Sequence, residues 1–478
     1  MKQPAAASLL ALSLLFSPKL PLAAESEILL TDKQNTGLSL SIYNNNLAFV
    51  RDSRSIDLPQ GQSLIAFEGV ARQMKPETAM LSGSALKVIE QNYDYNLLTS
   101  ANLQEASVGQ QVKTAVFNQE TGQDTFNTAT LLSTQSGMPV LEFSYGVETR
   151  FPGRIIYEKI PEGLRTKPTL VANVENAHRG EQNLELAYLT NGISWKADYI
   201  VEISSADKLN LNGWVTLNNQ SGTDYKNAQV QLIAGSVNQV QPVMPRNYAA
   251  GVMLKAAAFD SVAESAAAPA RESLGDYYMY TLPFQTTIKD KQSKQVSLMT
   301  NNDVSYNKEY RITSPLYLGL GTSLDEFEKQ NPAVIFKITN DKASNLGEPL
   351  PSGTVRMYEK DSSGTLQFIG ESPLSHAAVG EKIELNTGSA FDIWAKGKIT
   401  QSQNIAKDMR EIAVEITFEN SKNEDAEMAF IQSFGNQYQL LAESLTGEEK
   451  NSRTREWKFT LKPGEKQTLT FKVRVTNQ

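Results

Sequence analysis

The sequence predicts a mainly β, multidomain protein built from sandwiches and a small barrel, with an immunoglobulin-like sandwich at its C-terminal end. Short strand-like runs recur along the chain and are separated by residues that favour turns. The chain of 478 residues contains no cysteine, so disulfides cannot replace a large core. The clearest period-two alternation lies near the C-terminus, in three apolar sets: Ile412, Val414, Ile416 and Phe418; Trp457, Phe459 and Leu461; and Leu469, Phe471, Val473 and Val475.

The first residues are typical of a secretory signal. Lys2 precedes a short apolar run at 5–17, and small residues at 22–24 precede a polar stretch. We expect cleavage after Ala24 and export, with the periplasm as the predicted location and the cell surface or extracellular space as alternatives. No later apolar stretch approaches the about 20 residues of a membrane-spanning helix, so no transmembrane segment is expected after the signal is removed.

The N-terminal β region is predicted over residues 25–165. Strand-like runs flank reversal signals at 44–46 and 59–62, which favours a meander. A turn signal at 118–122 predicts a hairpin, and the part near residues 100–160 is expected to form a small barrel or sandwich.

A central β-sandwich region is predicted over residues 166–395. Within it, residues 184–235 contain three strand-like runs and two of the four tryptophans, Trp195 and Trp214. The turn residues from Asn219 to Gly222 favour a hairpin or short loop, so the strands on either side are expected to pair. The remaining residues, 396–478, are assigned to the immunoglobulin-like sandwich.

An alanine-rich segment at 241–275 interrupts the central region and is predicted to be a flexible excursion. The alternative is a partner-binding segment that becomes helical when docked. Just beyond it, Tyr277, Tyr278 and Tyr280 could stack on a sugar or a peptide. The alternation of Tyr278, Tyr280 and Leu282 instead favours packing within a sheet. Core packing is likewise predicted for the four tryptophans, Trp195, Trp214, Trp394 and Trp457.

The segments NGISWKADYIVEI at 191–203 and GWVTLNNQSGTDYKNAQVQLIAG at 213–235 resemble the hallmark of a family of secreted bacterial proteins, domain of unknown function family 4139. Its members resemble the C-terminal region of mucoidy inhibitor A proteins. The similarity continues in LPSGTVRMYEKDSSG at 350–364 and GSAFDI at 388–393, and it covers about residues 165–478. The resemblance implies a fold, but it supplies no catalytic residues.

No pattern for catalysis or metal binding stands out. The only two histidines are His178 and His376, and paired-histidine zinc signatures are absent. The acidic turn at 359–364 lies between two strand-like runs, which suggests a hairpin. It could hold calcium, but it lacks the alternating ligands of a calcium loop, and a plain solvent-facing turn is favoured; residues 32–37 fail the same test. We therefore predict no catalytic, cofactor-binding or metal-binding residues, and the ligand-binding residues stay open.

These observations predict an exported, non-enzymatic binding or structural component of the bacterial cell envelope, with an envelope protein or a glycan as partner. The formal net charge of −8, with charges spread along the chain, opposes nucleic-acid binding. One alternative is a carbohydrate-active hydrolase, because a catalytic carboxylate pair has no fixed sequence spacing. Another is an envelope assembly factor. A flat aromatic surface would favour binding, whereas a cleft with two facing carboxylates would favour the hydrolase; the oligomeric state stays open.

Overall fold

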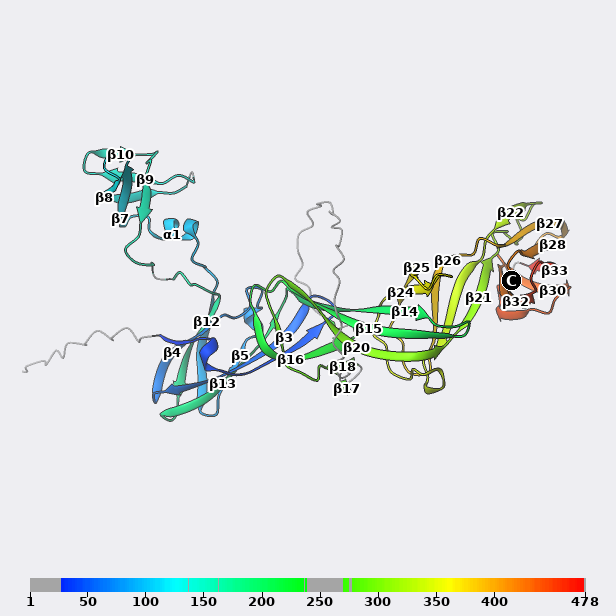
Figure 1. The fold of residues 1–478 in the computed structure, drawn as a ribbon, viewed down its shortest axis with the longest axis horizontal. Coiled ribbons are helices and arrows are strands. Elements are labelled where there is room, and N and C mark those ends of the chain that lie inside the picture. Colours follow the sequence, from blue (N-terminus) through cyan, green and yellow to red (C-terminus); the bar gives the residue numbers. More distant parts are fainter. Residues whose placement is uncertain are drawn as a thin grey trace, which may run out of the picture. The chain divides into compact units, whose positions relative to one another are not determined.

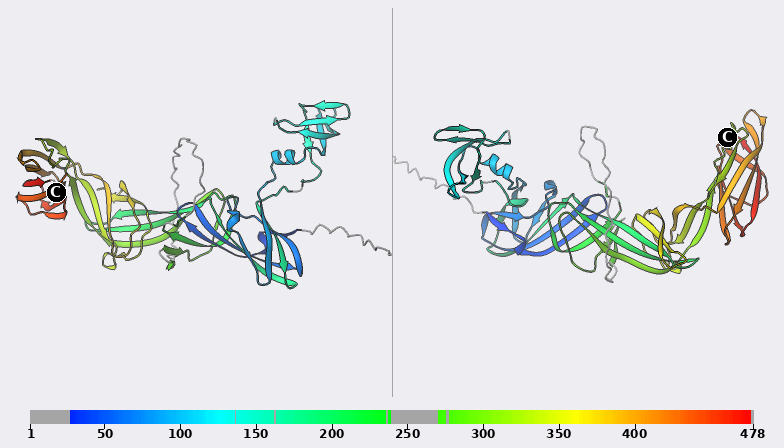
Figure 2. Two further views of the ribbon diagram at one scale, coloured as in Figure 1. Left: turned by 180° about the vertical axis from the view of Figure 1, so that it is seen from behind. Right: turned by 45° about the horizontal axis from the view of Figure 1, so that its top comes forward.

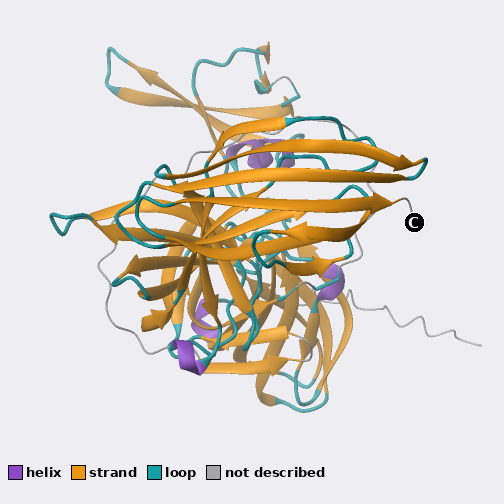
Figure 3. Ribbon diagram, turned by 90° about the vertical axis from the view of Figure 1, so that its right-hand side faces the viewer, coloured by secondary structure: helices purple, strands orange, loops and turns teal. Residues whose placement is uncertain are grey.

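The computed structural model describes residues 27–135, 137–161, 163–235, 237–238, 270–274 and 277–476. It is 64% strand and 4% helix, as the orange arrows of Figure 3 make plain, and this confirms the predicted mainly β architecture. None of the described helices is long and apolar enough to span a membrane. The predicted signal segment at 1–24 and residues 241–269 of the predicted alanine-rich segment lie outside the described residues.

The chain divides into two compact units, one formed by residues up to 38 together with 51–189, and one formed by 39–50 together with 190–478. In the first unit, β13 (Gly180–Thr190) lies between β3 (Leu47–Leu58) and β5 (Met80–Ser82). Two short 3-10 helices occur at Asp32–Gln34 and Pro76–Thr78. The β12 sheet has the order β1 (Ile28–Leu30), β4 (Gly61–Glu68), β12 (Thr169–Asn176) and β6 (Leu86–Asp94).

The first unit also contains a small antiparallel sheet, preceded by α1 (Ser100–Ala106); its strands are drawn in cyan in Figure 1. Its order is β10 (Gly146–Glu148), β9 (Val140–Phe143), β8 (Gln123–Ser133), β7 (Gln111–Asn118) and β11 (Arg154–Ile156). This sheet occupies the place of the predicted small barrel or sandwich. One of its faces buries Val112, Leu131 and Phe143, against which Phe151 packs.

The described part of the second unit contains strands of four sheets, together with a 3-10 helix at Lys342–Ser344. In the β16 sheet, β16 (Tyr225–Ala234) pairs with β2 (Asn35–Tyr43), β18 (Tyr277–Thr281) and β19 (Thr286–Ile288), and β17 (Ala270–Leu274) pairs with β18. The β15 sheet has the order β20 (Gln292–Ser305), β15 (Lys208–Asn219), β14 (Ile193–Ile203), β24 (Gly353–Lys360) and β25 (Leu366–Leu374).

The last two sheets form the C-terminal sandwich; strands β27, β28, β30 and β33 of the β28 sheet are drawn in orange to red in Figure 2. The β29 sheet has the order β26 (Lys382–Ser389), β23 (Ala333–Thr339), β21 (Asn307–Thr313), β29 (Ala426–Ser433), β32 (Thr454–Leu461) and β31 (Glu448–Asn451). The β28 sheet has the order β22 (Glu326–Gln330), β27 (Ile393–Ala406), β28 (Met409–Asn420), β33 (Lys466–Thr476) and β30 (Gln437–Glu443).

Aromatic side chains join the two sheets of this sandwich. Phe418 of β28 meets Phe430 of β29 edge to face, with ring centroids 5.4 Å apart. Trp457 of β32 stacks on Phe471 of β33 at 4.8 Å. All four side chains are buried, which the apolar alternation predicts for Phe418, Trp457 and Phe471. Such ring pairs add to the free energy gained by removing apolar surface from water.

Two of the predicted hairpins are present, and two predicted pairings are wrong. Strands β7 and β8 pair across the turn at 118–122, and β24 and β25 pair across the turn at 359–364. In contrast, β15 and β16 belong to different sheets, and so do β3 and β4. Because β2 and β3 do pair across the turn at 44–46, the first half of the meander predicted at 38–70 is confirmed and the second half is wrong. In both wrong cases the chain leaves one sheet at the turn and enters another.

A buried asparagine ends the strand before several of these crossings. Asn420, at the end of β28, has no exposed surface; its Nδ2 atom lies 2.9, 3.1 and 3.2 Å from the carbonyl oxygens of Glu424, Leu461 and Lys462. Its Oδ1 atom accepts a hydrogen bond from the backbone N–H of Lys422. Glu424 and Lys422 belong to the crossing from β28 to β29, whereas Leu461 and Lys462 belong to the crossing from β32 to β33. One amide therefore joins two crossings.

The same arrangement occurs at three further buried asparagines, each at or just beyond the end of a strand and each bound to carbonyls of two crossings. Asn176 binds Leu58, Pro59 and His178; Asn219 binds Thr223 and Ile288; and Asn340 binds Glu348, Ala377 and Ala378. Because a buried carbonyl without a donor is costly, these amides let the chain change sheets without losing hydrogen bonds.

Replacing Asn420 by alanine should lower the free energy of unfolding of the C-terminal sandwich by about 3 kcal/mol, since several buried backbone groups would lose their partner. Guanidinium denaturation followed by the fluorescence of Trp457 would measure the change. The matched control is Asn404→Ala, because Asn404 lies exposed on β27 and its loss should cost less than about 0.5 kcal/mol. Equal effects of the two changes would contradict the proposed role of the buried amide.

Candidate functional site

The predicted candidate metal ligands lie in separate local turns. Among the described residues there is no group of three or more His, Asp or Glu side chains arranged to hold a metal ion. The Nδ1 atom of His376 accepts a hydrogen bond from the backbone N–H of Ser352, 3.2 Å away. His178 lies in the crossing that follows β12, where its carbonyl accepts from Asn176.

The acidic turn at 359–364 uses its own carboxylate. The Oδ1 atom of Asp361 accepts hydrogen bonds from the backbone N–H groups of Ser363 and Thr365, and Oδ2 accepts from the side chain of Gln367. These bonds, with a further one from the Ser363 hydroxyl, lower the pKa of Asp361 to about 2. The turn is thus stabilised by its carboxylate, as expected of a solvent-facing turn.

The aromatic candidates fall into two groups. Trp195, Trp457 and Tyr280 are buried, which confirms the predicted core packing for these three. Tyr278 is 42% exposed, although its neighbour two residues along the strand is buried. Trp214 and Trp394 are only half-buried, because they point to the opposite face of their strands from the core residues beside them.

Trp214 belongs to a face that we call the β15 outer face, the side of the β15 sheet opposite its buried side chains. On β14 and β15 every second residue is buried, including Tyr199 and Val215, and the residues between them form this outer face. The side chains of this face that carry the argument are Lys196, Asp198, Ile200, Trp214, Thr216, Arg356, Tyr358, Phe368 and Glu371.

Asp198 is the centre of this face, and only 7% of it is exposed although it faces away from the core. It lies directly opposite Trp214 on β15 and beside Thr354 on β24. Its Oδ1 atom lies 3.1 Å from Nη1 of Arg356, and its Oδ2 atom accepts a hydrogen bond of 2.9 Å from the hydroxyl of Thr216. The carboxylate is therefore fixed by groups from two neighbouring strands.

Further ion pairs extend this network across the sheet. Lys196 lies 3.4 Å from Asp198, and Nε of Arg356 lies 3.4 Å from Glu371 of β25. Because Lys196 and Glu371 are largely exposed, their pairs contribute little stability. Their effect is to order charged groups of both signs at defined positions on the face.

Apolar surface lies beside the charges. Tyr358 and Phe368 are opposite one another on β24 and β25, with ring centroids 5.6 Å apart in an edge-to-face arrangement. Phe368 is 56% exposed and Ile200 is 40% exposed. An open sheet face with rigid aromatic rings and ordered charges suits recognition of another surface.

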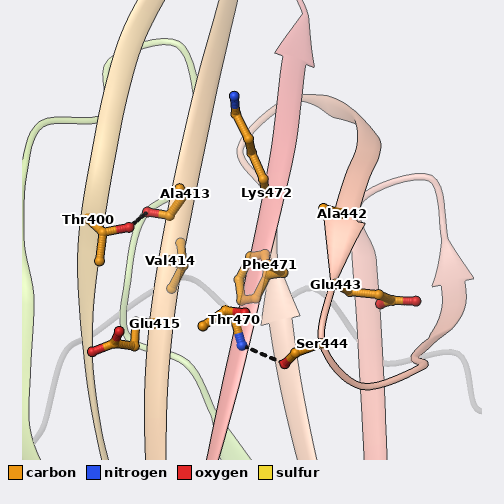
Figure 4. A pocket seen from close by; sticks show the side chains of 10 residues that line it. All are labelled: Thr400, Ala413, Val414, Glu415, Ala442, Glu443, Ser444, Thr470, Phe471 and Lys472. Carbon is orange, nitrogen blue, oxygen red and sulfur yellow. Dashed lines mark hydrogen bonds between the residues drawn. The ribbon is translucent and has the colours of Figure 1, made fainter.

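The C-terminal sandwich carries a shallow hollow of about 290 Å³ over β28, β33 and β30, which Figure 4 shows from close by. The polar groups around it already have partners. Lys472 pairs with Glu411, Glu415 pairs with Lys398, and the hydroxyl of Ser444 accepts from the backbone N–H of Thr470. Glu443 turns away from the hollow in Figure 4 and binds Arg455 and Trp457. Lys472, Glu415, Ser444 and Glu443 are therefore each engaged with a neighbouring residue.

The carboxyl pKa shifts of the described residues do not single out a general acid for the hydrolase alternative. A glycosidase needs a general acid whose pKa is raised. The carboxyl groups with a shifted pKa in the described part of the chain are all lowered: Asp361, Glu384, Glu411, Glu424, Glu443 and Glu456. These groups are held ionised by hydrogen bonds from neighbouring donors.

The residues of the β15 outer face were not singled out from the sequence, except for Trp214. Arg356 lies 158 positions from Asp198, so only the fold brings them together. The sequence offered one signal for this site: Asp198 lies between the alternating apolar residues of β14. A carboxylate in such a strand must either face away from the core or pair with another group.

Comparison with known proteins gives one family. The model of a family described as domain of unknown function, DUF4139, matches residues 184–477, which include every strand of the β15 sheet. No curated protein matches the chain.

The ionised carboxylate of Glu443 is expected to stabilise the folded C-terminal sandwich. Burial raises its pKa, but hydrogen bonds from Arg455 and Trp457 outweigh this and leave the pKa below its ordinary value. A lowered pKa in the folded state means that the stabilisation is present above about pH 4.5 and is lost as the pH falls through the folded value. Glu443→Gln should lower the free energy of unfolding by about 2 kcal/mol at pH 7 and by much less near pH 3.

Denaturant unfolding at a series of pH values would test this. Glu415→Gln is the matched control, because Glu415 lines the same hollow but is 39% exposed in its pair with Lys398. A destabilisation by Glu443→Gln that stays constant from pH 7 to pH 3 would contradict the role assigned to the charge.

Proposed function

Because the chain belongs to the DUF4139 family, whose function is unknown, we propose a function from the site itself: a non-enzymatic binding component of the bacterial cell envelope. Its recognition surface is the β15 outer face. The partner is an envelope protein, since a flat face of this kind complements another protein surface better than a small molecule.

The observation that carries this proposal is the buried carboxylate of Asp198 on an otherwise open face. Its bonds to Arg356 and Thr216 order the polar groups before a partner arrives, so little conformational entropy is lost on binding. Trp214, Tyr358 and Phe368 lie around this network and supply the large rigid side chains that dominate protein interfaces.

Two finer statements are part of the same proposal. Export to the periplasm is supported by the apolar segment at 5–17 and the small residues before Glu25, with the cell surface as the alternative. The second is the resemblance to the C-terminal region of mucoidy inhibitor A proteins, which rests on the segments at 191–203, 213–235, 350–364 and 388–393. An envelope assembly factor would use the same outer face, and the identity of the partner distinguishes it from a structural component.

Site-specific photocrosslinking in cells tests the surface. A photoreactive phenylalanine analogue at Phe368, in the tagged full-length chain, should give a discrete crosslinked product. The same analogue at Phe391, which is 81% exposed on the C-terminal sandwich, is the matched control and should not give that product. Trp214→Ala and Arg356→Glu should each reduce the product at least about tenfold, because each removes part of the interface core.

Two outcomes would contradict the proposal. Equal products from positions 368 and 391 would show that the face has no preference for a partner. Recovery of the full-length chain in the cytoplasm after osmotic shock and fractionation would contradict the envelope location, whatever the crosslinking shows.

A further inference from the structure

The first unit contains a second candidate site, where the chain passes from β6 into the small sheet and returns. A parallel bridge joins Leu97 to Arg165, and the backbone N–H of Arg165 donates to the carbonyl of Asn96 at 3.0 Å. Beside this crossing is a hollow of about 520 Å³, lined by Tyr93, Asp94, Tyr95, Asn96, Asn102 and Gly163. Its size is that of an ordinary small-molecule site.

Two tyrosines form an aromatic platform in this hollow. The rings of Tyr93 and Tyr95 stack with centroids 5.6 Å apart and an interplanar angle of 30°. The hydroxyl of Tyr93 lies 3.0 and 2.9 Å from the carbonyl oxygens of Ala71 and Arg72, and burial raises its pKa to about 12. Tyr93 is thereby fixed, and it supports Tyr95, which is 69% exposed.

The polar groups beside the platform are oriented by their own hydrogen bonds. Nδ2 of Asn102 donates to Oδ1 of Asn96 at 3.0 Å and to the carbonyl of Leu97 at 2.7 Å. This leaves the Oδ1 atom of Asn102 as an acceptor and the Nδ2 atom of Asn96 as a donor, and within the described residues no hydrogen bond reaches either atom. Asp94 accepts from Arg165 through Oδ2.

The charge of the site disfavours an anionic ligand. Arg165 is shared between Asp94, at 2.9 Å, and Glu27, at 2.6 Å, so the three side chains together carry one negative charge. An anionic ligand would be repelled. A neutral ring with hydroxyl groups fits both halves of the site, because its C–H groups can cover the electron-rich face of Tyr95 while its hydroxyls both donate and accept hydrogen bonds.

We propose that this hollow binds a pyranose ring of a neutral glycan, with Tyr95 as the stacking residue and Asn96, Asn102 and Asp94 as its hydrogen-bonding groups. The site is separate from the β15 outer face and does not depend on the function proposed there. The protein would then hold a glycan through its first unit and a protein partner through its second.

Calorimetric titration of the full-length chain tests this, with two neutral probes: the β-1,4-linked tetramer of N-acetylglucosamine, and maltotetraose. At least one should bind saturably. Tyr95→Ala should weaken that binding about tenfold, whereas Tyr95→Phe should stay within about twofold because the ring is kept. Asn102→Ala should weaken binding as well. Tyr145→Ala is the matched control, since Tyr145 is 67% exposed on the small sheet and should leave binding unchanged.

Absence of saturable binding to both probes would overturn the proposal, and so would binding that Tyr95→Ala leaves unchanged. An acidic tetrasaccharide of galacturonate that binds more tightly than both neutral probes would also overturn it. Trp214→Ala should leave glycan binding intact, so failure of this site and failure of the β15 outer face are separate results.

Discussion

The sandwiches of this protein depend on how the chain crosses from one sheet to the next. At four strand ends, backbone carbonyls of two crossings lie beside one buried asparagine, and a buried carbonyl left there without a donor would cost more than a typical surface contact contributes. Asn176, Asn219, Asn340 and Asn420 each meet this constraint with one side chain. An amide suits the position because it donates and accepts without carrying a charge into the core.

Period-two alternation predicted much of the core but little of the connectivity. The apolar residues of β28 and β33 are buried as their spacing predicts, because alternation reports which side of a strand faces the core. Alternation does not, however, indicate which other strand pairs with a given strand. The residues from Asn219 to Gly222 suit a hairpin and a crossing equally well, and the buried amide of Asn219 binds Ile288 of the second crossing, which no local pattern reveals.

The candidate site was harder to predict than the fold for a related reason. Trp214 is visible in the sequence, but as one of four tryptophans in strand-like contexts it favoured core packing. Its outward position follows from the phase of β15, which Val215 and Leu217 set by facing the core. Asp198 acquires its role only when β24 brings Arg356 beside β14, and a parallel pairing between strands so distant in sequence has no local signature.

The β15 outer face also differs from the outer faces of the C-terminal sandwich. On the β28 sheet, Glu411 pairs with Lys472 and Arg474 across neighbouring strands, and on the β29 sheet Glu309 pairs with Arg311 and Lys337. Such ladders keep a sheet face hydrated and discourage association. On the β15 sheet one such pair joins Lys360 to Glu202, but other charges gather around Asp198, with Trp214, Tyr358 and Phe368 beside them. A face that binds a partner needs both the ordered charges and the aromatic rings. The charges orient the partner, and the rings provide apolar surface that is removed from water when the two proteins meet.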